Sequence, residues 1–115
     1  MGGASETSEQ AAVVEWCELF GLPIVHIPNE GKRSKSYGAT LKRAGMRKGF
    51  PDLFLPLAKR GYHGFFIEMK YGKGRLSQEQ GKWLSELKNN GYATAVCYSA
   101  DDAVRLIKKY VEDDK

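Results

Sequence analysis

Two acids and a lysine in this sequence have types and spacings that can support metal-dependent chemistry. Asp52 opens the apolar run 52–57, and Glu68 and Lys70 close the run 64–70. Side chains alternate across a β-strand, so Glu68 and Lys70 point to the same side, roughly 6–7 Å apart. If the two runs form a hairpin centred near residues 60–61, Asp52 lies almost opposite Met69. It then lies beside the backbone of Glu68 and of Lys70. The sequence therefore predicts two carboxylates and an amine at one end of a buried hairpin.

Two carboxylates this close repel each other unless a positive charge lies between them. Mg²⁺ suits the position because it binds one or two carboxylates and keeps water ligands. A bound cation polarises a phosphate oxygen and activates a water, and Lys70 can position that water or offset developing charge. The backbone carbonyl of Met69 is the simplest further ligand. The alternative is structural: Lys70 forms an ordinary salt bridge with Glu68 or Asp52.

Apolar periodicity predicts the elements that must position these residues. Helices are expected over 6–20, 37–44, 77–91 and from Ser99 onward, and strands over 24–27, 52–57, 64–70 and 93–98. Ser5 or Ser8 is expected to cap the first helix, whose apolar stripe contains Val13, Trp16, Cys17 and Phe20. The hairpin strands are apolar on both faces, which is typical of the middle of a covered sheet. This order predicts a single α/β or α+β domain over residues 1–115, with residues 1–5 disordered.

The bulk composition excludes several classes of protein. With 42% hydrophobic and 28% charged residues, the chain is expected to be a folded globule. We expect no membrane span and no signal peptide, and hence a cytoplasmic protein of phage or bacterial type. Cys17 and Cys97 are interpreted as reduced core residues, with a disulfide as the alternative. There is no CxxC motif, so a structural zinc site is not expected.

Basic residues are concentrated between Glu30 and Asp52, where no acid occurs. They are Lys32, Arg33, Lys35, Lys42, Arg43, Arg47 and Lys48. Such a stretch indicates a basic face that neutralises phosphates, or alternatively a solvated loop. The expected DNA contacts are Lys32, Arg33, Lys35, Arg47 and Lys48, which would position a duplex without reading its sequence. Tyr37 is expected to pack, with stacking on an unpaired base as the alternative.

Three runs of residues together resemble the VRR-NUC family (virus-type replication-repair nucleases) of the PD-(D/E)xK superfamily. They are Gly49-Phe50-Pro51-Asp52-Leu53, Ile67-Glu68-Met69-Lys70 and Leu76-Ser77-Gln78-Glu79-Gln80. The likeness extends to Glu6 and Gln10, to residues 28–34 and to Asn90-Gly91-Tyr92, so it covers nearly the whole chain in the family's order. A lone Pro-Asp followed by Glu-x-Lys is a weak signal, whereas the full series is specific.

The resemblance implies a restriction-endonuclease-like α/β core, with a mixed sheet of about four strands flanked by helices. It implies Asp52 and Glu68 as ligands of Mg²⁺ or Mn²⁺ and Lys70 as the catalytic lysine. Gln80 matches a glutamine of the family, although Ser77-x-x-Gln80 is also typical of a capping box. The family pattern favours Glu6 as a further acid, with Glu9 as the alternative and helix-dipole stabilisation as the structural explanation of both.

Single-domain members of the family resemble phage proteins that act as dimers on branched DNA. The expected function is therefore a metal-dependent, structure-selective DNA endonuclease, and specifically a Holliday junction resolvase that works as a homodimer through a metal-activated water. No small-molecule substrate is expected. The alternatives are a nicking or flap nuclease of the same chemistry, or a DNA-binding module without catalysis.

Overall fold

The computed structural model of the chain describes residues 5–28 and 35–112. Within these ranges the elements follow the expected order. They are α1 (Glu6–Leu19), β1 (Val25–His26), α2 (Lys35–Arg43), β2 (Leu53–Leu55), β3 (Phe65–Met69), α3 (Gln78–Asn89), β4 (Ala93–Cys97) and α4 (Ala100–Val111). The strands are shorter than the apolar runs that predicted them, because pairing stops where Pro56 and the flanking loops leave the sheet.

The four strands form one mixed sheet in the order β1-β2-β3-β4. β2 is antiparallel to both β1 and β3, whereas β3 and β4 are parallel. β2 and β3 thus occupy the middle of the sheet, as their apolar character on both faces predicts. The expected α/β class, with about four strands flanked by helices, is confirmed.

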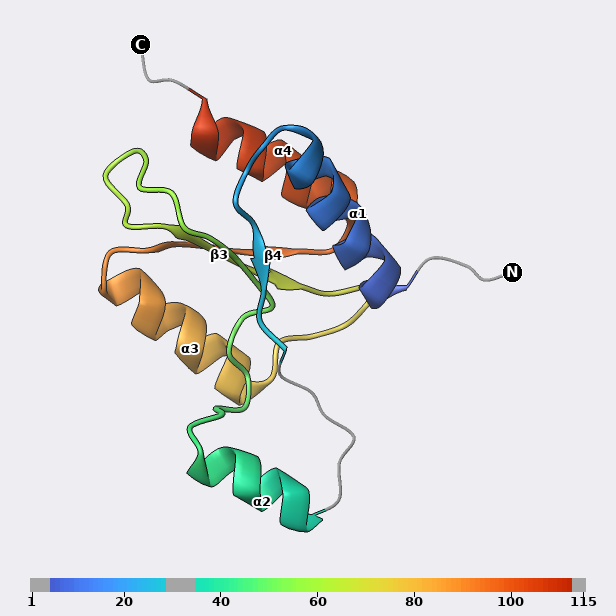
Figure 1. Cartoon of the computed structure of the whole chain (residues 1–115), viewed down its shortest axis with the longest axis vertical. Helices are drawn as coiled ribbons and strands as arrows, with labels where there is room; N and C mark the ends of the chain where they lie inside the picture. The colour runs from blue at the N-terminus through green and yellow to red at the C-terminus, as the bar shows by residue number, and fades with distance from the viewer. Residues whose placement is uncertain (1–4, 29–34, 113–115) are drawn as a thin grey trace.

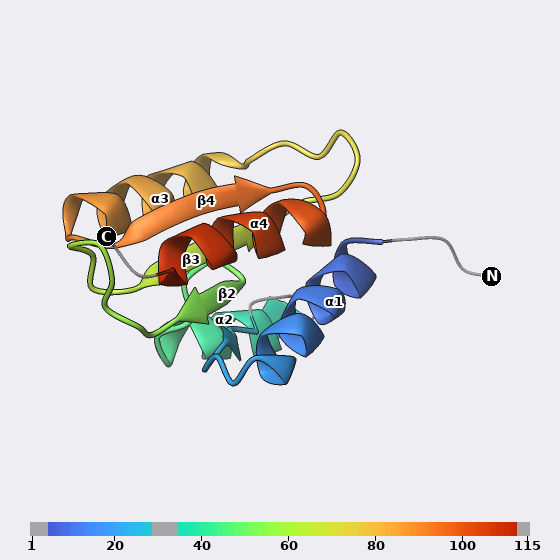
Figure 2. The ribbon, with the colours of Figure 1, turned by 90° about the horizontal axis from the view of Figure 1, so that it is seen from above.

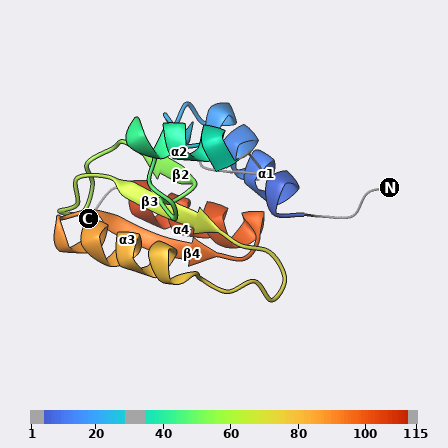
Figure 3. The same ribbon diagram turned by 90° about the horizontal axis from the view of Figure 1, so that it is seen from below.

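Helices cover both faces of this sheet. α1 and α4 lie together on one face and α3 lies on the other (Figure 2 and Figure 3), while α2 projects away from the sheet at the bottom of Figure 1. On the α1/α4 face, inward residues of the helices and strands form the buried core. Its buried members are Val13, Cys17, Leu53, Leu55, Phe65, Ile67, Met69, Cys97, Ala103, Ile107 and Tyr110.

The α3 face of the sheet is packed with aromatic rings. Phe54 of β2 stacks on Phe66 of β3 with ring centroids 4.3 Å apart. Phe50 meets Phe66 edge-on at 5.4 Å and Trp83 of α3 edge-on at 5.0 Å. Phe50 therefore joins the segment before β2 to both the sheet and α3.

The expected hairpin register was wrong by one residue. Leu53 pairs with Ile67, so continuing the ladder places Asp52 opposite Glu68 and not opposite Met69. The tip itself follows the expected register, because Lys59 bridges Tyr62. The shift arises at Pro56, where the Leu57 N–H donates to the Leu55 carbonyl at 2.9 Å and makes a tight turn that adds one residue to the outgoing arm.

Two expectations for the first helix are tested by the structure. The expected cap is confirmed at Ser5, whose hydroxyl accepts a hydrogen bond from the Ser8 N–H at 3.1 Å. Ser5 is therefore ordered, although it was expected to belong to a disordered segment, and residues 1–4 lie outside the described residues. Phe20 does not belong to the core. It is 63% exposed at the end of α1, with its ring 4.7 Å from that of Trp16.

Cys17 and Cys97 are both buried and free, which confirms that they are core thiols and not a disulfide. Burial raises the pKa of each to about 11, so both stay protonated near neutral pH. In the described part of the chain, no helix combines the length and hydropathy that crossing a bilayer requires.

Candidate active site

Asp52 and Glu68 come together on the α3 face of the two central strands. Leu53 and Ile67 are paired and point into the core, so their neighbours Asp52 and Glu68 point to the opposite face. Asp52 Oδ2 accepts a hydrogen bond from the Met69 N–H at 2.9 Å, which holds this carboxylate against the end of β3. The predicted meeting of the two acids is thus present, with a more direct opposition than the expected register implied.

Glu68 is a buried carboxyl group with incomplete hydrogen bonding. Its residue is only 2% exposed, and among the described residues its Oε1 has no hydrogen-bond partner. Burial, then repulsion by Asp52 and a hydrogen bond shared with the Asp52 carboxyl, raise the pKa of Glu68 to about 8. When both acids are ionised there is no proton for them to share, and the two carboxylates repel each other. The position therefore calls for a proton or a cation.

Gln80 makes contacts of two kinds, one set as part of a helix cap and one hydrogen bond to Glu68. Its Oε1 accepts from the Ser77 N–H at 2.8 Å, and the Ser77 hydroxyl accepts from the Gln80 N–H at 3.1 Å, which completes a capping box at the start of α3. Its Nε2 donates to Glu68 Oε2 at 3.0 Å. Because the cap occupies the amide oxygen, only the amino group is directed at Glu68.

Lys70 follows the last residue of β3 and is half-buried. Its backbone N–H donates to the Cys97 carbonyl at 2.8 Å, which continues the pairing with β4 and fixes the start of its side chain. Its positive charge lowers the pKa of Glu68, so the ammonium lies within electrostatic reach of the acids. Within residues 5–28 and 35–112, no ion pair joins Lys70 to either acid, which argues against the simple salt-bridge interpretation.

The two acids of the first helix have different surroundings. Glu9 Oε1 accepts from the Ala100 N–H at 2.7 Å, so Glu9 helps to cap α4 together with Ser99. Glu6 is exposed in the first turn of α1, and its charge contributes to raising the pKa of Glu68. Of the two, Glu6 is therefore the acid whose charge reaches Glu68, whereas Glu9 has a structural role that accounts for it.

The residues present fit a hard divalent cation. Two neighbouring carboxylates, one of which has a buried oxygen without a hydrogen-bond partner among the described residues, match the ligand set of Mg²⁺, which completes its shell with water. No group of three His, Cys, Asp or Glu side chains that could hold a metal occurs in the described ranges. Met69 lies between Glu68 and Lys70, and its N–H donates to Asp52, so its backbone is adjacent to both acids.

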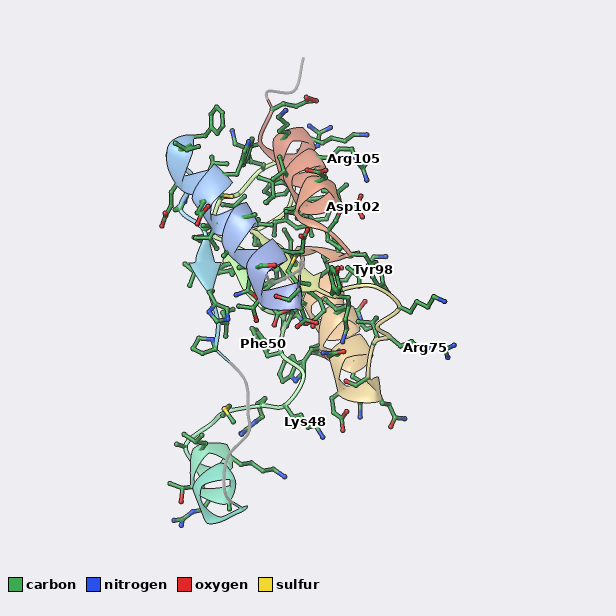
Figure 4. The ribbon with its side chains drawn as sticks, turned by 90° about the vertical axis from the view of Figure 1, so that its right-hand side faces the viewer. Lys48, Phe50, Arg75, Tyr98, Asp102 and Arg105 are labelled. Atoms are coloured by element: carbon green, nitrogen blue, oxygen red, sulfur yellow. The ribbon has the colours of Figure 1, made fainter. Side chains whose placement is uncertain are left out.

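The expected DNA contacts are only partly among the described residues. Lys32 and Arg33 lie outside them, as does the side chain of Lys35, whose backbone begins α2. Arg47 is exposed and donates to the Lys42 and Met46 carbonyls, at 3.0 and 3.3 Å, so part of its role is to close the turn after α2. Lys48 is exposed and points away from the body of the molecule below Phe50 (Figure 4).

Further cations near the site were not singled out from the sequence. Lys82 lines a hollow of about 450 Å³ on α3 together with Lys48, Trp83, Glu79 and Glu86. Arg75 extends from the loop after Lys70 (Figure 4), and Lys73 is exposed in the same loop. The loop does carry a sequence signal, because Lys70, Lys73 and Arg75 fall within six residues without an acid among them. Basic residues thus both precede Asp52 and follow Glu68 along the chain.

Comparison with known proteins agrees with this geometry. The model of the VRR-NUC domain family matches residues 4–101, a range that includes both acids, Lys70 and Gln80. Among solved structures, one chain, titled "VRR_NUC domain protein", is 27% identical and superposes with a TM-score of 0.83. The alignment covers 96% of this chain and 91% of that one. No curated protein matches.

Proposed function

The chain belongs to the VRR-NUC domain family of nucleases, and on that basis we propose that it is a metal-dependent DNA endonuclease whose substrate is branched DNA. The preferred substrate in this proposal is a four-way Holliday junction. The whole of residues 1–115 is taken as one nuclease domain. The observation that supports catalysis most directly is the unpartnered Oε1 of the buried Glu68 among the described residues, placed against Asp52.

In this proposal Asp52 and Glu68 hold Mg²⁺ or Mn²⁺ together with the Met69 carbonyl. The cation, when bound, supplies a Lewis acid for a phosphate oxygen and lowers the pKa of a water. Groups of the protein itself orient the two carboxylates. The Met69 N–H fixes the Asp52 carboxylate, and the Gln80 amino group fixes that of Glu68.

Lys70 acts as the catalytic lysine in the proposed reaction. Its ammonium stabilises negative charge that accumulates on the phosphate during water attack, or holds the attacking water in line. Glu6 adds a carboxylate at the rim of the site, where it can accept a hydrogen bond from water. Asp52, Glu68, Lys70, Gln80 and Glu6 then form the complete proposed catalytic set.

The proposed DNA-binding surface consists of Lys32, Arg33, Lys35, Arg47 and Lys48. Lys48 is exposed beside the segment that carries Asp52, and Lys82 lines the same hollow. Contacts from such side chains go to phosphates, so they orient a duplex over the acids without sequence preference. Selectivity for branched DNA would then come from shape.

A homodimer is part of this proposal. Each chain brings one pair of acids, whereas resolving a four-way junction requires two symmetric cuts. A two-fold dimer presents two sites in a fixed mutual orientation and makes both cuts within one complex. The rival within the same chemistry is a nicking or flap nuclease, which needs one cut. The rival of a different class is a DNA-binding module that does not cut.

Cleavage of four synthetic DNAs distinguishes these functions. Labelled four-way junction, flap, nicked duplex and intact duplex are incubated with the chain in Mg²⁺, in Mn²⁺ and in EDTA. We expect paired symmetric nicks in the junction that require a divalent cation. Asp52→Asn serves as the control, since it keeps the side-chain volume but removes a ligand charge; it should bind the junction and leave it intact.

The other outcomes decide between the rivals. Cutting confined to the flap or the nicked duplex replaces the resolvase with the second candidate. Binding without cutting in either cation supports the non-catalytic module, and cutting that persists in EDTA overturns the metal-dependent chemistry. Sedimentation of the protein with and without junction DNA tests the dimer, because a monomer throughout contradicts paired cutting.

A further inference from the structure

Gly49 makes an unusually close backbone approach to the first turn of α3. A Cβ atom at this position would lie 2.7 Å from the carbonyl carbon and the Cβ of Glu79, and 2.8 Å from the Gln80 nitrogen. Most of these are backbone atoms, which cannot rotate away. The φ angle of Gly49 is also +87°, in the left-handed region. Both the close contact with α3 and the positive φ angle therefore disfavour a side chain at position 49.

The atoms that Gly49 approaches belong to the turn that presents Gln80. The Gln80 N–H is the group that donates to the Ser77 hydroxyl in the capping box. The Gln80 side chain leaves the same residue to reach Glu68 Oε2 at 3.0 Å. Along the chain, Gly49 is followed by Phe50, which packs on Phe66 and Trp83. Asp52 lies two residues after Phe50.

We propose that Gly49 is a positioning residue of the active site: its missing side chain lets the first turn of α3 come close enough for Gln80 to hold Glu68. The proposal deepens the function above and rests on it only in taking the acids as a cation site. Gly49 itself touches no reacting group. It acts through the spacing between the Asp52 segment and α3.

The size of the expected displacement follows from contact distances. Ordinary contacts of a Cβ atom begin at about 3.4 Å, so an added methyl at 2.7 Å requires a separation of about 0.7 Å. The Gln80–Glu68 hydrogen bond already measures 3.0 Å. A shift of that size along the direction of this bond takes it beyond the range in which a side-chain hydrogen bond exists. Glu68 would then lose the donor that orients it.

The test compares Gly49→Ala with two matched glycine variants. Gly61 has φ +85° and open space where a Cβ would be, so Gly61→Ala reproduces the backbone strain without the collision. Gly91 has φ +94° and a Cβ there would lie 2.6 Å from the His63 ring, so Gly91→Ala reproduces strain and collision away from the acids. Both controls are remote from the proposed catalytic set.

Two readouts are needed. The first is the ¹⁵N NMR spectrum of the cation-free protein, in which the Gln80 side-chain amide and the Ser77 N–H report the hydrogen bonds directly. The second is calorimetric Mg²⁺ binding. We expect Gly49→Ala alone to shift both NMR signals and to weaken Mg²⁺ binding roughly tenfold, the usual effect of losing a group that orients a metal ligand. Gly61→Ala and Gly91→Ala should lower the stability of the fold but keep the wild-type NMR signals and the wild-type Mg²⁺ affinity.

The proposal is overturned if Gly49→Ala retains the wild-type Gln80 signal, or if either control weakens Mg²⁺ binding equally. A measurement on the wild type covers the case in which Gly49→Ala does not fold. Titrated Mg²⁺ should move the Gly49 and Gln80 side-chain signals with one midpoint and leave Gly61 in place; an unmoved Gly49 signal also overturns it. The cation-free spectra do not depend on cleavage, so failure of the nuclease assay remains a separate result.

Discussion

At the scale of single residues, Glu68 is placed where an ionised carboxylate is costly. It is 2% exposed, lies against a second acid and has one oxygen without a partner among the described residues. A globular core normally avoids such an arrangement. Groups with strongly perturbed pKa values are concentrated at functional sites. The cost to folding is accounted for if the acid is kept for binding a cation.

This placement predicts an unusual pH dependence of stability. The pKa of Glu68 rises from 4.5 to about 8 in the folded chain, so the folded state holds a proton that the unfolded state has released. The contribution of Glu68 is fully present below about pH 4.5 and is lost as pH rises to about 8. Relative to Glu68→Gln, the wild type should therefore lose unfolding free energy across this window, measured by urea denaturation in EDTA.

A divalent cation should reverse that loss. Mg²⁺ at one hundred times its dissociation constant adds about 2.7 kcal/mol to the unfolding free energy of a protein that binds it only when folded. The gain should appear at pH 8 in the wild type and be absent in Glu68→Gln. Equal stabilisation of both proteins would mean that the cation binds elsewhere.

At the scale of elements, the start of α3 combines a helix cap with a hydrogen bond to Glu68, a member of the proposed active site. Ser77→Ala removes the hydroxyl that accepts from the Gln80 N–H, at a cost of about 1 kcal/mol. Ser99→Ala removes the equivalent bond to the Asp102 N–H at the start of α4 and should cost the same. Only Ser77→Ala should also weaken Mg²⁺ binding, as calorimetry would measure. Equal Mg²⁺ affinity in both variants would mean that the Ser77 cap does not contribute to cation binding.

The hairpin shows why the register matters at this scale. The turn at Pro56 shifts the pairing by one residue between the tip and the ladder, and a shift of one residue moves side chains to the opposite face. Asp52 consequently shares its face with Glu68. Proline has no N–H to donate to a ladder, so the site of the shift is chemically reasonable. The expected register, taken from the tip alone, could not include it.

At the scale of the whole molecule, basic side chains from separate segments lie at one hollow. Lys48 precedes β2 and Lys82 lies on α3, and both line one hollow. Replacing each by Gln should weaken junction binding and reduce the slope of log affinity against log salt by about 0.9 for each phosphate that the variant no longer neutralises. Lys109→Gln is the control, since Lys109 lines a different hollow with Tyr110 of α4. Fluorescence anisotropy over a salt series measures the junction affinity and its salt dependence. An equal change in slope for Lys109→Gln would mean that the DNA does not bind at the hollow of Lys48 and Lys82.

Local patterns were enough to predict the elements and to predict that Asp52 and Glu68 lie close together. Alternation along two apolar runs predicted the central hairpin, and helical spacing with Ser caps predicted the positions of α1, α3 and α4 within a few residues. The order of residues around Asp52, Glu68 and Gln80 was sufficient for the family resemblance. These signals are local because hydrogen-bond periodicity and capping depend on neighbours within a few positions.

Tertiary structure decided the features that depend on distant segments. Whether Gln80 caps its helix or reaches Glu68 was an open alternative in the sequence, and both occur because α3 packs against β3. Glu9 was an alternative to Glu6 in the sequence, and the structure gives Glu9 a partner in the Ala100 N–H because α4 lies against α1. The close approach of Gly49 to α3 joins residues thirty positions apart. Packing across the sheet sets such distances, and no periodicity along the chain encodes them.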